Sequence, residues 1–446
     1  MTTPAPGLLL AAPASGSGKT TLTLALLRRL RNEGVAVASV KAGPDYIDPA
    51  FHQAASGRPC VNLDGWAMRP QTLAAALKIA GDGAELILGE GVMGLFDGAP
   101  LRDDQGLAAG STAQLAALTG WPVVLVVDCA GMGASVAALA RGFAGFHPAV
   151  SVAGVIFNNV ASARHEGLLR EACGDAGLPV FGALHRAARL QRPSRHLGLV
   201  QAGEDADLED FLDAAAGAIG GLDLGALRAA ARPHRLAGEE SLAPLRPLGQ
   251  RIAVARDLAF AFAYPLLLEG WRLAGAELLP FSPLADEAPD AAADAVYLPG
   301  GYPELHAGRL AGNLRFLEGL RAAAARDAAI YGECGGYMVL GRGLEDAEGR
   351  RHGFAGLLPL ESSFRAPQRH LGYRRATLAA AGPLGPQGAA FRGHEFHYAR
   401  VLGEEGPAET ALFRVAAADG TPQGSAGQRR GSAFGSFLHL VDRELS

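Results

Sequence analysis

The sequence predicts an α/β protein of two domains, the first built on a mostly parallel, doubly wound sheet. Up to about residue 220, short apolar runs alternate with segments of helical periodicity, the pattern of successive βα units. A stretch rich in Pro, Arg, Gly and Ala follows, and a second series of apolar runs begins at Arg251. At 446 residues the chain is long enough for two separate cores. We therefore expect domains over 1–219 and 250–446, joined by a linker over 220–249.

The composition excludes several classes of function. The net charge of −5 provides no general basic field for nucleic acid. The cysteines are widely spaced, with no CxxC pair, which fits a reducing compartment and favours neither a disulfide framework nor a zinc site; they are Cys60, Cys129, Cys173 and Cys334. No apolar run approaches the roughly 20 residues of a membrane span, and the opening MTTPAPG lacks the features of a signal peptide. We expect a cytoplasmic protein with no nucleic-acid or membrane partner.

The first predicted βα unit contains a glycine-rich turn. Leu8–Ala11 is an apolar run typical of a buried strand, and Thr20–Leu30 has helical spacing. A glycine turn between strand and helix is the context of a phosphate-binding loop, because its N–H groups and the helix dipole converge on one hollow. An ordinary βα turn is the plainer alternative. The expected nucleotide-binding residues are Ser15, Gly16, Ser17, Gly18, Lys19, Thr20 and Thr21, with Lys19 on the outer phosphates and Thr20 on Mg²⁺.

Acidic residues follow two further predicted strands. Val35–Val40 runs into KAGPDYIDPAFH, residues 41–52, which we expect to be a loop because Gly43-Pro44 and Asp48-Pro49 break regular structure. Glu85–Leu88 is followed by GEGVMGLFDG, a segment too rich in glycine to build a core. The acids at these two strand ends are Asp45, Asp48, Glu90 and Asp97, and Lys41 accompanies them.

Ligands of open α/β sheets gather at the carboxyl ends of strands, so these acids predict a metal–phosphate site. Their mutual repulsion would be costly without a cation. We expect Lys41 to contact the nucleotide and Thr20, Asp45 and Glu90 to hold Mg²⁺. For Asp45 and Asp48 a plain turn role is the alternative.

The remaining elements follow the same alternation. In the first domain we expect strands over 122–128, 152–158 and 179–184, and helices over 131–140 and 205–218. In the second domain the expected strands are 251–255, 277–280, 295–298 and 328–331.

The last of these strands leads into YGECGGYM. Small residues flank Cys334 and a helix is expected to follow, which is the arrangement of a nucleophile elbow. A helix N-terminus lowers the pKa of a thiol, and the N–H groups of Gly335 and Gly301 are candidate oxyanion donors. A buried structural thiol is the alternative, and for the other three cysteines it is the favoured interpretation. The expected base is His439, at the end of a short apolar run, whereas His394 and His397 are expected to shape the cleft or a domain interface.

Six stretches together resemble the cobyrinic acid a,c-diamide synthase family, including its members that act on hydrogenobyrinic acid. They are KAGPDYIDPAFH, EGVMGLFDG, PLADE, LPGGYPELHA, YGECGGYM and GHEFHY, and the resemblance covers nearly the whole chain. It implies an ATP-dependent amidoligase P-loop domain of dethiobiotin-synthetase type, followed by a class I, flavodoxin-like glutamine amidotransferase domain. Lys19, Thr20 and the four acids fall on the ligase motifs, and Cys334 and His439 on the glutaminase nucleophile and base. In the general triad a Glu stands two residues after the His, but here Leu440-Val441 follow His439, which leaves a Cys–His dyad or another orienting group.

The implied activity is ATP- and Mg²⁺-dependent amidation of the a and c acetate groups of a corrin polycarboxylate, with glutamine as the nitrogen donor. A homodimer is compatible with the resemblance. Cobyric acid synthase-like amidation is an alternative, although that family lacks the GPDYIDP stretch. A P-loop switch ATPase fused to a glutaminase domain is another, disfavoured because residues 13–15 carry no second loop lysine. The presence of cobalt in the substrate and the order of amidation stay open at this point.

Overall fold

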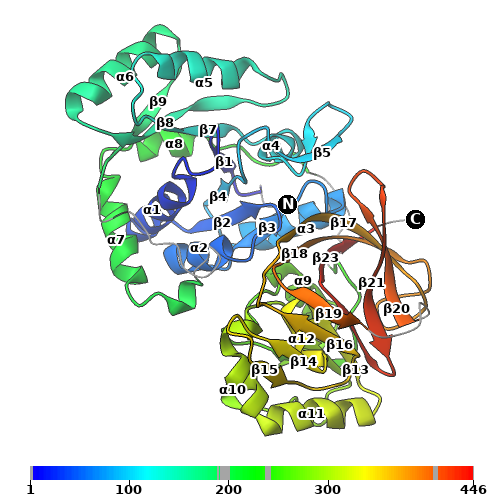
Figure 1. The fold of residues 1–446 in the computed structure, drawn as a ribbon. Helices are drawn as coiled ribbons and strands as arrows, with labels where there is room; N and C mark the ends of the chain where they lie inside the picture. Colours follow the sequence, from blue (N-terminus) through cyan, green and yellow to red (C-terminus); the bar gives the residue numbers. More distant parts are fainter. Residues whose placement is uncertain (1–3, 188–189, 191–200, 237–242, 405–409, 445–446) are drawn as a thin grey trace. The chain divides into compact units, whose positions relative to one another are not determined.

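The computed structural model describes residues 4–187, 190, 201–236, 243–404 and 410–444 (Figure 1). The contacts within the chain define two compact units. The first comprises Met1–Trp66 and Leu73–Glu240, and the second comprises Ala67–Thr72 and Ser241–Ser446.

The first unit contains a seven-stranded parallel sheet with the order β3-β2-β4-β1-β7-β8-β9. Its strands are β1 (Gly7–Ala11), β2 (Val37–Ala42), β3 (Val61–Leu63), β4 (Leu86–Glu90), β7 (Val123–Asp128), β8 (Val152–Val160) and β9 (Val180–His185). The chain starts at the central strand β1 and winds outward in both directions, which confirms the predicted doubly wound sheet. A small hairpin, β5 (Ala99–Arg102) and β6 (Ala108–Ala109), lies outside it.

Helices connect these strands. They are α1 (Lys19–Asn32), α2 (Asp48–Ser56), α3 (Pro70–Gly81), α4 (Thr112–Thr119), α5 (Ser135–Gly145), α6 (Ala163–Asp175), α7 (Leu208–Ala218) and α8 (Leu224–Ala230), with a short 3₁₀ turn η3 (Ala202–Glu204). The predicted leucine stripe of α1 is buried, because α1 packs against α2 and α7 (Figure 1). Helix α5 packs against α6 in the same unit.

Two sequence expectations differ from the structure of this unit. Residues 41–52 are not all loop, because α2 begins at Asp48 with Pro49 in its first turn, where the fixed φ of proline favours a helix and no N–H is missed. Part of the expected linker over 220–249 is also folded. Helix α8 buries Leu227 in the core of the first unit, and Arg232 exchanges two backbone hydrogen bonds with Gly7. Residues 237–242 of that segment lie outside the described residues.

The second unit contains a ten-stranded mixed sheet with the order β11-β10-β12-β13-β22-β21-β20-β17-β18-β23. The first five in this order pair in parallel and the others are antiparallel. The strands are β10 (Arg251–Ala255), β11 (Glu277–Phe281), β12 (Ala295–Leu298), β13 (Ala329–Glu333), β17 (His370–Leu378), β18 (Ala390–His397), β20 (Ala411–Ala417), β21 (Pro422–Arg430), β22 (Ala433–Ser436) and β23 (Leu438–Arg443).

The rest of this unit packs around that sheet. A four-stranded sheet has the order β15-β14-β16-β19, formed by β14 (Gly343–Glu345), β15 (Arg351–Gly353), β16 (Leu360–Ser363) and β19 (Arg400–Glu404). The helices are α9 (Pro265–Leu273), α10 (Ala307–Gly312), α11 (Leu314–Ala325) and α12 (Gly335–Leu340), with 3₁₀ turns η4 (Pro283–Ala285) and η5 (Pro303–His306). All six residues of α12 are buried, and the helix contacts β12 and β13.

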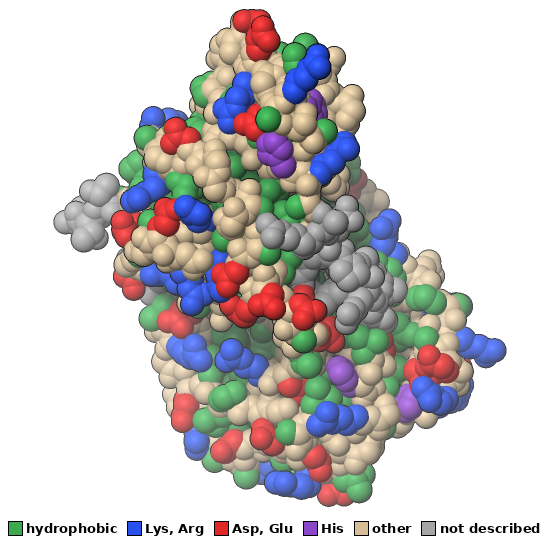
Figure 2. Space-filling view, turned by 90° about the vertical axis from the view of Figure 1, so that its left-hand side faces the viewer, with side chains coloured by type: hydrophobic (Ala, Val, Ile, Leu, Met, Phe, Trp, Pro, Cys, Tyr) green, Lys and Arg blue, Asp and Glu red, His purple; other side chains and the backbone are tan. Residues whose placement is uncertain are grey.

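Side chains of both charges are mixed on one face of the protein (Figure 2). On the face drawn in Figure 2, lysine and arginine side chains are interspersed with acidic ones. None of the described helices is long and apolar enough to cross a bilayer.

Candidate active sites

The glycine-rich turn between β1 and α1 is held in shape from inside the protein. Gly18 precedes the helix in the left-handed conformation, with φ of +86°. A Cβ atom there would lie 2.1 Å from Nδ2 of Asn158, which donates a hydrogen bond of 2.9 Å to the carbonyl of Ser17. Both the conformation and the close approach therefore require glycine. The result is the predicted strand–turn–helix, with Lys19 and Thr20 at the helix start.

The strand ends beside this turn carry a compact group of charges. Lys41 on β2 and Glu90 on β4 are register partners, and the ammonium lies 2.9 Å from Oε1 of Glu90. It also lies 2.6 Å from Oδ2 of Asp48. Thr20 donates a hydrogen bond of 2.6 Å to the same Glu90 oxygen. The structure thus brings together Thr20, Lys41, Asp48 and Glu90, as predicted, but the cation between the carboxylates is Lys41 itself. Because Lys41 supplies the cation that the acids require, their closeness is not by itself evidence for a metal ion.

The protonation of this group follows from its burial and its partners. Burial opposes a charge on Lys41, but the carboxylates of Glu90 and Asp48 outweigh it and raise the pKa of the ammonium. Burial also works against the ionised form of Glu90, yet Lys41 and His52 lower the pKa of that carboxyl. Asp48 differs, because burial and the neighbouring Asp45 raise its pKa to about 7. The Lys41–Glu90 pair is accordingly the permanently charged part of the site.

The other two predicted acids lie further out. Oδ1 of Asp45 accepts the backbone N–H groups of Ile47 and Asp48, and its second oxygen is 3.8 Å from Lys41. Asp45 therefore has the turn role as well as a place at the rim of the charged group. Asp97 accepts the N–H of Gly94 at 3.0 Å.

Lys19, at the start of α1, lies near these acids. Its ammonium donates to the carbonyl oxygen of Met93 at 2.5 Å. Burial lowers the pKa of Lys19, while the negative charges of Glu90, Asp48 and Asp97 act in the opposite direction. The lysine is therefore already aimed at the glycine-rich loop that contains Met93 and Asp97.

Sequence reasoning missed His52, which is completely buried. Its Nε2 lies 2.7 Å from Oε2 of Glu90, and its Nδ1 lies 3.4 Å from the sulfur of Cys60. Burial disfavours the charged imidazole, but Cys60 and Glu90 raise its pKa to about 10. The spacing of four residues between Asp48 and His52 was the available signal, because it places both on one face of a helix.

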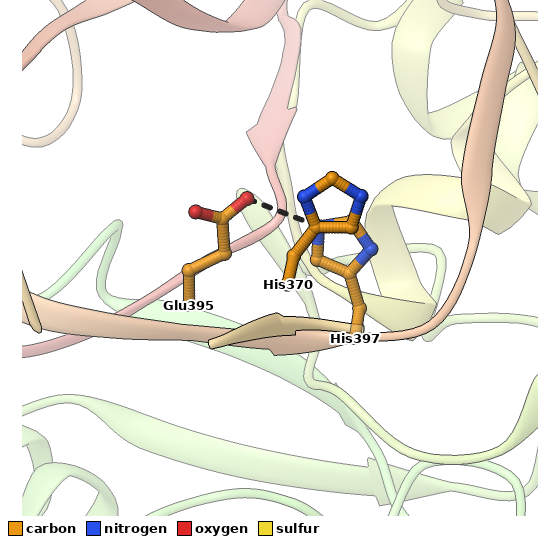
Figure 3. Close-up of side chains that lie close together, drawn as sticks. All are labelled: His370, Glu395 and His397. Carbon is orange, nitrogen blue, oxygen red and sulfur yellow. Dashed lines mark hydrogen bonds and ion pairs between the residues drawn. The ribbon is translucent and has the colours of Figure 1, made fainter. Parts of the chain in front are cut away.

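The oxygens of Thr20, Asp48 and Glu90 are donors of the kind that Mg²⁺ takes. Among the described residues, however, three potential metal ligands meet within 4.8 Å elsewhere, at His370, Glu395 and His397 (Figure 3). There the rings of His370 and His397 are stacked with an interplanar angle of 7°, so their lone pairs lie in two parallel planes and do not converge on one point. Glu395 is also paired with His397 at 3.0 Å and with Arg374 at 2.8 Å. We assign no metal to this cluster.

Cys334 forms the predicted elbow between β13 and α12. Its φ of +48° and ψ of −104° are strained for a residue with a side chain. Glycines permit the turn, because a Cβ on Gly336 would lie 2.0 Å from the carbonyl oxygen of Leu298. A Cβ on Gly335 would lie 3.1 Å from the backbone nitrogen of Gly301, so the two predicted oxyanion donors are neighbours.

The thiol is not activated by its position alone. Burial raises the pKa of Cys334, and the negative charge of Glu304 acts in the same direction. The expectation of a lowered pKa is therefore wrong. Helix α12 has only six residues, all buried, and its dipole does not offset the loss of hydration. A thiolate has to be produced by transfer of the proton to a base.

His439, the predicted base, lies near the cysteine. Gly300 lies next to both side chains. A Cβ atom placed on this glycine would be 3.3 Å from Nε2 of His439 and 3.4 Å from Cβ of Cys334. Burial lowers the pKa of His439, with His394 and His397 contributing, so the imidazole is neutral and can accept a proton. His394 stacks on His439 with a centroid distance of 4.9 Å, so its ring forms part of the surroundings of that imidazole.

A phosphate-binding loop with a charged strand-end group, on a chain that also carries a Cys–His elbow, defines a class of enzyme. Family comparison agrees with both halves. A model of the CobQ/CobB/MinD/ParA nucleotide binding domain matches residues 8–200, and a model of the CobB/CobQ-like glutamine amidotransferase domain matches residues 251–444. The protein is an amide-forming ligase that uses a nucleotide and glutamine.

The curated relatives identify the family more closely. The chain is 56% identical over 440 residues to a hydrogenobyrinate a,c-diamide synthase of Sinorhizobium sp, with 98% of each chain covered. It is 55% identical to the enzyme of that name from Brucella abortus and 53% identical to the one from Rhodobacter capsulatus, again with 98% of each chain covered. The chain therefore belongs to the hydrogenobyrinate a,c-diamide synthase family.

Proposed function

We propose that this protein converts hydrogenobyrinic acid into its a,c-diamide in cobalamin biosynthesis, with ATP as the energy source and glutamine as the nitrogen donor. The observation that carries the proposal is the identity of 56% across 98% of both chains with a synthase of this name. The two sites support it independently, because one is suited to a nucleotide and the other to an amide substrate.

The glutaminase half-reaction uses Cys334 and His439. The imidazole takes the thiol proton, the sulfur attacks the side-chain amide carbon of glutamine, and the backbone N–H groups of Gly301 and Gly335 stabilise the oxyanion. The C–N bond breaks and ammonia leaves with a proton returned by His439. Water then hydrolyses the thioester, which releases glutamate and restores the thiol.

The ligase half-reaction takes place at the strand ends of the first unit. A substrate carboxylate attacks the γ-phosphorus of ATP, ADP leaves, and ammonia then displaces phosphate from the acyl phosphate to give the amide. The residues proposed to bind the nucleotide are Ser15, Gly16, Ser17, Gly18, Lys19, Thr20, Thr21 and Lys41. Lys19 holds the outer phosphates, and Lys41, anchored by Glu90 and Asp48, adds a second positive charge.

Thr20 and Glu90 are the proposed holders of Mg²⁺. Asp48 lies 3.5 Å from the Thr20 hydroxyl and is a better placed third oxygen donor than Asp45, which lies at the rim. The ion would supply positive charge to the phosphate oxygens. We further propose that the enzyme acts in the cytoplasm, where ATP and glutamine are available; its four cysteines are free, consistent with a reducing compartment. A homodimer, detectable by light scattering, is the proposed assembly.

Mass spectrometry of corrinoid products tests the substrate. The enzyme is incubated with ATP, Mg²⁺, glutamine and either hydrogenobyrinic or cobyrinic acid. We expect the diamide to accumulate through a monoamide and hydrogenobyrinic acid to be the faster substrate. Faster turnover of cobyrinic acid would reverse the assignment of the cobalt-free substrate. Amidation beyond two groups would favour the cobyric acid synthase-like alternative.

A further inference from the structure

We propose that Glu333, the residue directly before the nucleophile, is a positioning residue that orients His439 and stabilises its protonated form. It would take the place of the Glu that general triads carry two residues after the His. The inference rests on the proposed glutaminase half-reaction.

The two side chains face each other in the interior of the second unit. Glu333 ends β13 and His439 lies on β23, and Oε2 of the carboxylate is 3.8 Å from Nδ1 of the imidazole. Only 1% of either residue is exposed. A separation of 3.8 Å is longer than a hydrogen bond, but catalytic contacts often shorten when substrate binds.

The carboxylate is fixed by three donors from three strands. Tyr297 on β12 donates to Oε2 at 2.9 Å, and Tyr331 on β13 donates to Oε1 at 2.8 Å. The backbone N–H of Leu440, next to His439, donates to Oε1 at 3.2 Å. A carboxylate in this position is costly to bury. Its retention in an otherwise apolar strand is explained if its charge is used.

The opposite edge of the imidazole is the one that meets the nucleophile. A Cβ atom placed on Gly300 would be 2.4 Å from Cε1 and 3.3 Å from Nε2 of His439. The same atom would be 3.4 Å from Cβ of Cys334. The ring is therefore arranged with Nδ1 toward Glu333 and its other edge toward the cysteine. This is the relation that an acid, an imidazole and a nucleophile have in a triad.

The usual third position is occupied by an apolar residue. Side chains alternate along a strand, so Val441 shares the face of His439, and it is buried. His394 covers the ring by stacking, and the hydroxyl of Tyr264 binds Nε2 of His394 at 2.8 Å. Glu333 is the acid that faces Nδ1 of His439, at 3.8 Å.

The test compares Glu333→Gln with the matched control Glu345→Gln, an acid in β14 whose contact is the Ser363 hydroxyl. Glutamate release by the full enzyme is measured as kcat and KM, with a melting curve for each variant. We expect Glu333→Gln to lower kcat about 10- to 100-fold with little change in the KM for glutamine, and Glu345→Gln to leave both unchanged. Amidation supported by ammonium chloride should persist in both. An unchanged kcat in folded Glu333→Gln overturns the proposal.

A double-variant experiment separates positioning from a structural role. The rate at which iodoacetamide alkylates Cys334 is measured in the wild type, Glu333→Gln, His439→Ala and the double variant, with Cys334→Ala as the blank. If Glu333 acts through His439, its substitution slows alkylation in the wild type but has no further effect in His439→Ala. Additive losses would assign Glu333 a structural role. Because alkylation needs no corrin or ATP, its outcome is independent of the proposed substrate.

Should Glu333→Gln fail to fold, a tyrosine pair keeps the test decisive. Tyr297→Phe removes the donor to the oxygen that faces His439, whereas Tyr331→Phe removes a donor to the other oxygen. We expect the first to lower glutaminase kcat several-fold more than the second. Equal effects would contradict an orienting role for Oε2.

Discussion

The two sites differ in whether their buried groups carry a charge. In the first unit, Lys41 and Glu90 are buried as charges, each neutralised by a partner on a neighbouring strand. In the second unit, Cys334 and His439 are buried as neutral groups, because burial raises the pKa of one and lowers that of the other. A site for phosphates needs fixed charge, whereas a site for proton transfer needs groups whose charge appears only during the reaction.

Lys19→Ala is the largest expected disruption of the charged site. It should abolish amidation with glutamine and with ammonia, because the outer phosphates lose their cation. Basal glutamate release should remain measurable, since Cys334 and His439 belong to the other unit. Diamide formation and glutamate release are measured in parallel. An equal loss of both would indicate misfolding or a different role for the loop.

Cys334→Ala should break the neutral site and leave the charged one intact. We expect glutamine-dependent amidation to fall by several orders of magnitude, because the elbow then carries no nucleophile. Amidation at high ammonium chloride should continue. The substitution removes one small side chain, so a melting curve should show a cost of about 1–2 kcal/mol at most. Loss of the ammonia-dependent reaction in a folded variant would contradict the division between the two sites.

Glu90→Gln and Asp45→Asn compare the loss of a buried charge with the loss of a charge at the rim of the site. Both should lower the ligase kcat, but their effects on stability should differ. Glu90 is paired with Lys41 and His52, and breaking such buried pairs costs about 3–5 kcal/mol. Asp45 is a partly exposed rim residue, and its substitution should cost less than about 1 kcal/mol. Chemical denaturation and ligase kinetics across Mg²⁺ concentrations provide the measurement; equal stability losses would contradict the buried-pair assignment.

The last expected effect concerns the pH dependence of stability and not the catalytic rate. Burial raises the pKa of Glu333 to about 7, whereas in the unfolded chain it titrates near its ordinary value. Between these two values the folded state holds a proton that the unfolded state has lost, so this group makes the second unit less stable as pH rises. Glu333→Gln should remove that contribution, which is up to about 3 kcal/mol between pH 4 and 7. Urea unfolding at pH 5 and pH 8 measures it, and an identical pH slope in wild type and variant would contradict the shift.

Much of the first unit was predictable because it is local. The strand at Leu8, the glycine turn and the leucine stripe of α1 are adjacent in sequence, and each has a physical signature of its own. In the second unit, the pairing of β17 with β20 and of β18 with β23 joins segments far apart in the chain, so no local pattern predicts it. The helix at Asp48 was mistaken for loop because proline breaks a helix interior but favours its first turn.

By itself, the sequence determined the order of the βα units, the phosphate-binding loop, the cysteine elbow and the family. Only the tertiary structure decided which charges meet. Lys41 proved to be the cation between the carboxylates, His52 a hidden partner of Glu90, and Glu333 the acid beside His439. These pairings depend on strand register and on burial, which set the distances and the local dielectric. The spacing of residues along the chain predicts neither these distances nor the local dielectric.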